Sequence, residues 1–293
     1  MSEQSLTLPT NISDDLKMTR SGFRLLSTMS PGLAGRVAVN LFLTPRKRPV
    51  SQSAQTIMSQ AKPFLVRHGS RQLAAYIWEN SGPTVLLVHG WESNASGMRG
   101  FVRPLLAAGF RVVAFDAPAH GRSQGRQTNF VDYHGALQTV IHQVGPVHGV
   151  VAHSFGAAVT LYTLSQQSYL GVQRIVSLGA PSRLQDFVTV WTGFLGMPAA
   201  AVEQMQRRLV DRVGIPIERV AVETAVTQLT VPGLIIHDRQ DRIVSFTNAE
   251  LIAQNWQTAT LHVTEGLDHR GSLQDRDVIR RVVAFLGNES VIS

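Results

Sequence analysis

The chain has 293 residues, of which 44% are hydrophobic and 16% charged, and it contains no cysteine. This composition indicates a folded protein with a large core, and it excludes disulfides, a cysteine nucleophile and thiolate metal sites. The net charge of +7 suits anionic surfaces, but the arginines are scattered and not interleaved with aromatic residues, so we expect no nucleic-acid binding.

The N-terminal part, residues 1–60, differs from the rest of the chain. Apolar residues recur at helical spacing from Phe23 to Leu41 around the break SPG at 30–32, and the basic stretch PRKRP at 45–49 follows. These features predict two short amphipathic helices and a basic linker. Two interpretations stay open. The helices pack on the main domain, or their apolar face and the basic cluster make a homodimer or membrane-surface contact.

The same region bears on where the protein resides. Its N-terminus lacks the basic start and apolar core of a secretory signal. The apolar stretch 33–43 is interrupted by polar residues and is shorter than the roughly 20 residues that cross a bilayer. We therefore expect a soluble, cytoplasmic protein without a transmembrane segment.

From Pro63 onward, strand-like and helix-like segments alternate. Segments 63–69 and 72–79 predict an opening hairpin. Later strand-like runs lie at 84–90, 111–116, 149–154, 174–181, 233–238 and 260–265. Because helix-like segments separate most of these apolar runs, we expect an α/β fold, with a mostly parallel doubly wound sheet and helices on both faces.

Residues 181–230 interrupt this alternation. They contain no strand-like run but two apolar stripes at helical spacing, one of which includes Trp191 and Phe194. We interpret the segment as a helical cap over the carboxyl edge of the sheet, inserted between core segments 61–180 and 231–293.

The segment VVAHSFGAAVT, residues 150–160, places Ser154 between a strand-like run and a helix-like run. A strand that turns directly into a helix needs small neighbours, here Ala152 and Gly156, and strains the residue between them. A side chain on that turn stands at the positive end of the new helix. The position is therefore suited to a nucleophile, which also requires a base, an acid and oxyanion donors.

Two later strand ends offer the acid and the base. The run GLIIHD continues as RQDRIV and supplies Asp238 and Asp241, while TLHVTE continues as GLDHR and supplies His269. Doubly wound sheets bind their ligands at the carboxyl ends of the strands. The chain order serine, acid, histidine is the order found in α/β-hydrolases.

From about residue 72 to the end, the chain resembles the α/β-hydrolase superfamily of Ser-His-Asp serine hydrolases. Four segments carry the resemblance in order: LLVHGW, FDAPAHGRS, VAHSFG and HDRQDRIV…GLDHR. By position, Ser154 resembles the nucleophile, His269 the base and Asp241 the acid. Asp238 stands where the family usually has glycine, and it remains the weaker alternative for the acid.

The resemblance also implies an oxyanion hole made by the backbone N–H groups of Trp91 and Phe155. We expect the acyl pocket to be lined by residues beside the nucleophile or in the cap: Trp91, His153, Trp191 and Phe194. Four histidines lie near the same sheet edge: His89, His120, His153 and His237. Their spacing is not that of a metal site, so we expect them to support the site or line the pocket, and we expect neither metal nor cofactor.

Three positions depart from the family pattern. Ala152 replaces the first glycine of the serine turn, and its methyl group is small enough to fit. Ala119 replaces a loop glycine, which indicates a slightly different turn after Asp116. Asp268 stands beside the base where glycine is common, and it would raise the pKa of the imidazole if it pointed inward.

From these observations we expect a hydrolase that needs no cofactor. It would act on a small-molecule acyl substrate and cleave its carboxylic ester through an acyl-enzyme intermediate. One alternative is a thioesterase or acyltransferase that uses a larger acyl donor. The other is a hydrolase-fold protein that binds without catalysis, although the chain retains every residue type of the triad.

Overall fold

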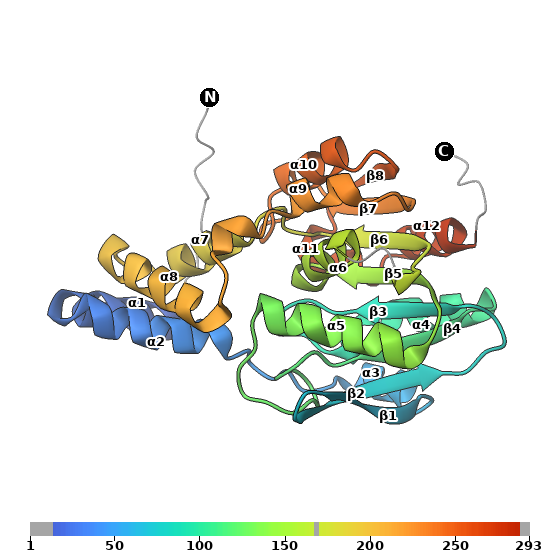
Figure 1. Ribbon diagram of the computed structural model, residues 1–293, viewed down its shortest axis with the longest axis horizontal. Helices are drawn as coiled ribbons and strands as arrows, with labels where there is room; N and C mark the ends of the chain where they lie inside the picture. Colours follow the sequence, from blue (N-terminus) through green and yellow to red (C-terminus); the bar gives the residue numbers. More distant parts are fainter. Residues whose placement is uncertain (1–13, 167–169, 288–293) are drawn as a thin grey trace. The chain divides into compact units, whose positions relative to one another are not determined.

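The computed structural model describes residues 14–166 and 170–287 (Figure 1). These residues form two compact units. The helical unit comprises residues 14–42 and Gln185–Arg219, and the sheet unit comprises the described residues of Leu43–Leu184 and 220–287. This division differs from the expected one, because the N-terminal helices group with the inserted helices while the basic linker belongs to the sheet unit. Within the described ranges, no helix is both long enough and apolar enough to cross a bilayer.

The sheet unit is built on one eight-stranded sheet, ordered β1-β2-β4-β3-β5-β6-β7-β8. The strands are β1 (Lys62–His68), β2 (Arg71–Trp78), β3 (Thr84–Val88), β4 (Arg111–Phe115), β5 (Val147–His153), β6 (Arg174–Leu178), β7 (Gly233–Asp238) and β8 (Ala259–Thr264). β1 and β2 pair as the expected hairpin, β2 runs antiparallel to β4, and every other pairing is parallel. The mostly parallel α/β sheet is therefore confirmed, and its strand order reverses beside β3, where such sheets open a crevice.

Helices cover both faces of this sheet (Figure 1). They are α3 (Gln52–Met58), α4 (Arg99–Ala107), α5 (Phe130–Val144), α6 (Phe155–Gln166), α9 (Val222–Ala225), α10 (Thr247–Asn255), α11 (Asp268–Gly271) and α12 (Arg276–Leu286). α4 and α12 share one core with alternate residues of the strands, and α5 packs beside α6. The central strand β3 is buried along its whole length, as its continuous apolar sequence predicts. The sheet thus gives the loops at its carboxyl edge a rigid base.

The helical unit consists mainly of α1 (Asp14–Met29), α2 (Pro31–Leu43), α7 (Leu184–Phe194) and α8 (Ala199–Val213), with Leu43 and Leu184 assigned to the sheet unit. The Phe42 ring lies 5.7 Å from that of Phe187 and 5.2 Å from that of Trp191. Gly35 lets α2 approach α8 closely, because a Cβ there would lie 2.6 Å from the Cβ of Gln204. The N-terminal helices therefore pack on the inserted helices, a pairing that the sequence analysis did not include.

Candidate active site

Ser154 stands on the turn between β5 and α6 that the sequence predicts. Its φ of 55° lies in the left-handed region, which is strained for a residue with a side chain. The turn is held by the Ser154 N–H, which donates to the Leu178 carbonyl at 2.8 Å. Gly156 is required two residues later, since a Cβ there would lie 2.1 Å from the His89 carbonyl oxygen. Close packing of α6 against the loop after β3 thus fixes the position of the serine.

The structure brings the predicted acid and base to this serine. His269 Nε2 lies 2.9 Å from Ser154 Oγ, and His269 Nδ1 lies 2.7 Å from Asp241 Oδ2. Since an ionised carboxylate only accepts hydrogen bonds, Nδ1 carries the proton and donates it to Asp241. Nε2 is then free to accept the hydrogen bond from the serine hydroxyl. All three side chains are largely buried, so this polar chain is shielded from bulk water.

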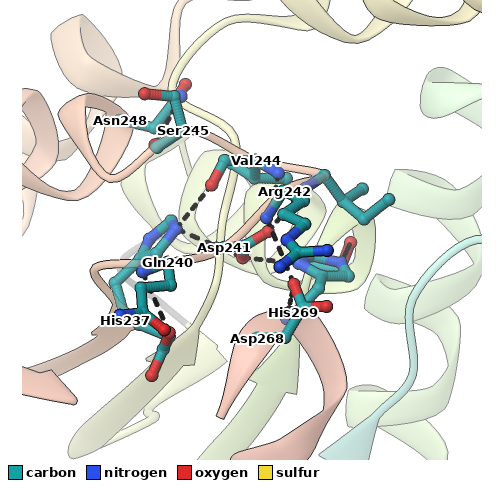
Figure 2. Close-up of polar contacts among 12 residues, drawn as sticks. His237, Gln240, Asp241, Arg242, Val244, Ser245, Asn248, Asp268 and His269 are labelled. Carbon is teal, nitrogen blue, oxygen red and sulfur yellow. Dashed lines mark hydrogen bonds and ion pairs between the residues drawn. The ribbon is translucent and has the colours of Figure 1, made fainter. Parts of the chain in front are cut away.

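Asp241 is fixed by its own loop (Figure 2). Its Oδ1 accepts the backbone N–H groups of Ile243 and Val244 at 2.8 and 2.9 Å. The His237 ring lies beside Oδ2 at 3.3 Å and donates through Nε2 to the Val244 carbonyl at 2.8 Å. Burial by itself would raise the pKa of Asp241, but the hydrogen bonds from His237, His269 and Val244 outweigh burial and hold that pKa below its usual range. The carboxylate is therefore ionised at neutral pH.

Asp238, the alternative acid, has a different set of partners. Its Oδ1 accepts the Gln240 N–H at 3.0 Å, and its Oδ2 accepts the Thr264 hydroxyl and the Leu267 N–H, both at 2.9 Å. Burial would raise the pKa of Asp238, but these hydrogen bonds lower it overall. Asp238 thus ties the loop after β7 to the loop after β8, while Asp241 contacts the His269 ring.

Asp268 also joins these two loops. It adopts a left-handed φ of 55°, and its Oδ1 accepts the N–H groups of His269 and Arg242 at 2.8 and 3.2 Å. The carboxylate is therefore engaged by backbone donors, as Figure 2 shows. This contact orients the backbone on which His269 stands.

The two residues expected to form the oxyanion hole lie beside the serine. Phe155 follows Ser154 as the first residue of α6. The loop that leads to Trp91 passes next to the nucleophile, because a Cβ on Gly90 would lie 2.9 Å from the Ser154 Cβ. The Trp91 and Phe155 rings meet edge to face with 5.2 Å between their centroids.

Three buried histidines support these loops. His89 and His120 each accept one backbone N–H, from Ala117 and Glu92, and donate to one carbonyl. His153 donates to the His269 carbonyl at 2.9 Å. Burial lowers the pKa of His89 to about 4, and burial together with a neighbouring histidine lowers those of His120 and His153 to about 3. All three are therefore neutral at neutral pH, and the pocket role expected for His153 stays a prediction. Within the described residues no cluster of histidine and carboxylate side chains is arranged to hold a metal.

The other predicted pocket residues lie in the helical unit. The Trp191 ring packs edge to face on Phe42, and Phe194 is 43% exposed while its carbonyl accepts a hydrogen bond from Arg20. Their role in an acyl pocket stays a prediction.

His237, one of the histidines expected to support the site, lies beside the acid that follows it four residues later in the chain. Sequence reasoning missed Gly179, which lies beside the side chains of both the acid and the base. Its φ of +57° favours glycine, and a Cβ on it would lie in van der Waals contact with His269 Nδ1 at 3.4 Å and Asp241 Oδ2 at 3.5 Å. The predicted strand-like run 174–181 included Gly179, whereas β6 ends at Leu178.

Comparison with known proteins agrees with this architecture. Residues 85–282, more than half of the chain, match the alpha/beta hydrolase family. Human monoglyceride lipase is 23% identical over 269 residues, which cover 77% of this chain and 87% of that protein. A human serine hydrolase-like protein is 35% identical over 96 residues, covering 30% of this chain and 45% of the relative. The solved structure of an esterase from Pyrococcus furiosus aligns with a TM-score of 0.67 at 22% identity, covering 84% of this chain and 99% of that one. The chain therefore belongs to the alpha/beta hydrolase family.

Proposed function

We propose that the protein is a serine hydrolase that cleaves carboxylic esters, with Ser154 as nucleophile, His269 as general base and Asp241 as the acid that orients it. One observation carries the proposal. A continuous chain of hydrogen bonds runs from Ser154 Oγ through both ring nitrogens of His269 to Asp241, with distances of 2.9 and 2.7 Å. Such a chain lets a neutral serine become a nucleophile at neutral pH.

The reaction proceeds in two halves. Ser154 Oγ attacks the ester carbonyl while His269 Nε2 takes its proton, and the backbone N–H groups of Trp91 and Phe155 stabilise the oxyanion. His269 then gives the proton to the leaving alcohol, and the acyl group stays on the serine. A water molecule, deprotonated by His269, releases the acid. Asp241 holds Nδ1–H and stabilises the imidazolium in both halves.

The choice of an ester follows from the relatives. Human monoglyceride lipase and an esterase from Pyrococcus furiosus are similar to this chain, and their names denote ester cleavage. A thioesterase or an acyltransferase would use the same acyl-enzyme and would differ only in the leaving group or in the acceptor. A protein that binds without catalysis would not need an ionised, buried acid beside His269.

A panel of p-nitrophenyl esters of increasing chain length, run beside coenzyme A thioesters of the same acyl chains, tests the proposal. We expect turnover of the oxygen esters, covalent labelling by a fluorophosphonate, and a loss of at least about 10³-fold in Ser154→Ala. Ser177→Ala is the matched control, because Ser177 is a buried serine on β6 whose hydroxyl has no hydrogen-bond partner among the described residues. Labelling that persists in Ser154→Ala would reject Ser154, and faster cleavage of every thioester would reject the ester assignment.

A further inference from the structure

A concave site apart from the triad lies within the helical unit, between α2 and α8. These helices run side by side in Figure 1, and Gly35 brings them close together. A hollow of about 290 Å³ opens at this groove. It is lined by residues of both helices: Arg36 and Val39 of α2, and Arg208, Asp211 and Arg212 of α8.

The hollow concentrates positive charge. Arg208, Asp211 and Arg212 lie three and four residues apart and therefore share one face of α8, as Arg36 and Val39 share one face of α2. Three arginines and one aspartate thus line the hollow. Like charges placed close together repel, so an arrangement with this excess of arginine favours an anion among them.

Arg208 gives an independent indication of a missing partner. Its Nε is inaccessible to solvent and has no hydrogen-bond partner in the described part of the chain. Buried donors are almost always paired, because an unpaired one forfeits its hydrogen bonds to water. The preceding residue, Arg207, is a useful contrast, since it is exposed and forms an ion pair with Glu203 on its own helix. The two adjacent arginines therefore differ in environment although they share a helix.

We propose that this hollow binds a small phosphate monoester through Arg36, Arg208 and Arg212. Planar guanidinium groups donate paired hydrogen bonds that match phosphate oxygens. The volume is close to the lower limit of about 300 Å³ for small-molecule sites, so the hollow suits an organic phosphate of modest size. Asp211 accepts hydrogen bonds and repels further negative charge, which favours a phosphate that carries hydroxyl groups. Arg212 is already oriented, because its Nη2 donates to Asn40 Oδ1 at 3.3 Å.

The test uses the full chain with glycerol 3-phosphate as the probe, and glycerol and inorganic phosphate as comparators, at low ionic strength. Calorimetry and thermal unfolding report on binding independently of ester cleavage. We expect saturable binding of glycerol 3-phosphate, weaker binding of inorganic phosphate and none of glycerol. Arg208→Gln should weaken binding at least tenfold, and Arg36→Gln should also weaken it. Arg207→Gln, which removes the same charge from the next position, should stay within twofold of wild type.

Two source molecules share this chemistry, a free phosphate metabolite and a lipid headgroup. Sedimentation with phosphatidylcholine vesicles, with and without phosphatidic acid, separates them. If the vesicles with phosphatidic acid sediment the wild type but not Arg208→Gln, the site binds a lipid headgroup. If the wild type binds only soluble glycerol 3-phosphate, the site binds a free metabolite. If Arg208→Gln does not fold, as judged by circular dichroism, Arg36→Gln decides. Absence of binding by the wild type, or equal losses in Arg207→Gln and Arg208→Gln, would overturn the proposal.

Discussion

Replacing Asp241 with asparagine tests the geometry of the candidate active site most directly. Oδ1 accepts two backbone N–H groups, from Ile243 and Val244. The amide oxygen of asparagine must take that place, because an NH₂ group there would face two donors. The NH₂ group then faces His269 Nδ1, which lies 2.7 Å from Oδ2 in the wild type. To accept this hydrogen bond, His269 must move its proton to Nε2, the nitrogen that faces Ser154.

A histidine protonated on Nε2 cannot take the serine proton. We therefore expect kcat to fall by about 10⁴-fold in Asp241→Asn, the magnitude associated with a wrong histidine tautomer in a serine triad. KM should change little, because Asp241 lies on the opposite side of the His269 ring from Ser154. The assay is steady-state cleavage of a p-nitrophenyl ester together with the rate of fluorophosphonate labelling, on protein whose folding is verified by thermal unfolding.

Asp238→Asn is the matched control, three residues earlier at the end of β7. The new NH₂ group takes the place of one carboxylate oxygen, so the acceptor for Gln240, or the acceptor for Thr264 and Leu267, is lost. This change should lower the free energy of unfolding by about 1–3 kcal/mol. It should leave kcat of the folded protein within about tenfold of wild type. Folded Asp241→Asn with kcat within tenfold of wild type would refute the reasoning. So would a larger loss of kcat in Asp238→Asn.

Two further predictions concern stability. The three buried histidines have a lower pKa in the folded protein than the ordinary value near 6.5. Their contribution to the free energy of unfolding is therefore complete above pH 6.5 and is lost as the pH falls towards 3–4. The loss is about 1.4 kcal/mol for each histidine and each pH unit. The melting temperature should therefore fall steeply below pH 6.5, less so in His153→Asn, and a flat profile down to pH 4.5 would contradict this. Trp191→Ala removes the ring that packs on Phe42, so it should cost about 2–3 kcal/mol, less than for a fully buried tryptophan. An unchanged melting temperature together with a preference for longer esters would favour the pocket role instead.

The sheet and the serine turn were predictable because each is constrained locally. A strand buried on both faces is apolar over most of its length, as in β3, and the turn at Ser154 leaves no room for a side chain at Gly156. The partner of the N-terminal helices was not predictable. An apolar stripe identifies the face of a helix that is buried but not what covers it, and here Phe42 meets α7, which lies far along the chain. The contact of His237 with Asp241 was not predictable either, since a single histidine at the end of a strand suits a core equally well.

The strained residues of the chain show how stability and the candidate site are coupled. Among the described residues, the non-glycine positions with left-handed φ are Glu92, Ala119, Ser154 and Asp268. Glu92, Ala119 and Ser154 lie in loops or turns that follow a strand, and Asp268 is the first residue of α11 after β8. Each such conformation costs about 1–3 kcal/mol. They persist because strands in fixed register hold the start of each segment, and because backbone contacts such as the hydrogen bond from Ser154 N–H to the Leu178 carbonyl stabilise this conformation. A core substitution that loosens β3 or β5 should therefore disturb the geometry around Ser154 before it unfolds the sheet.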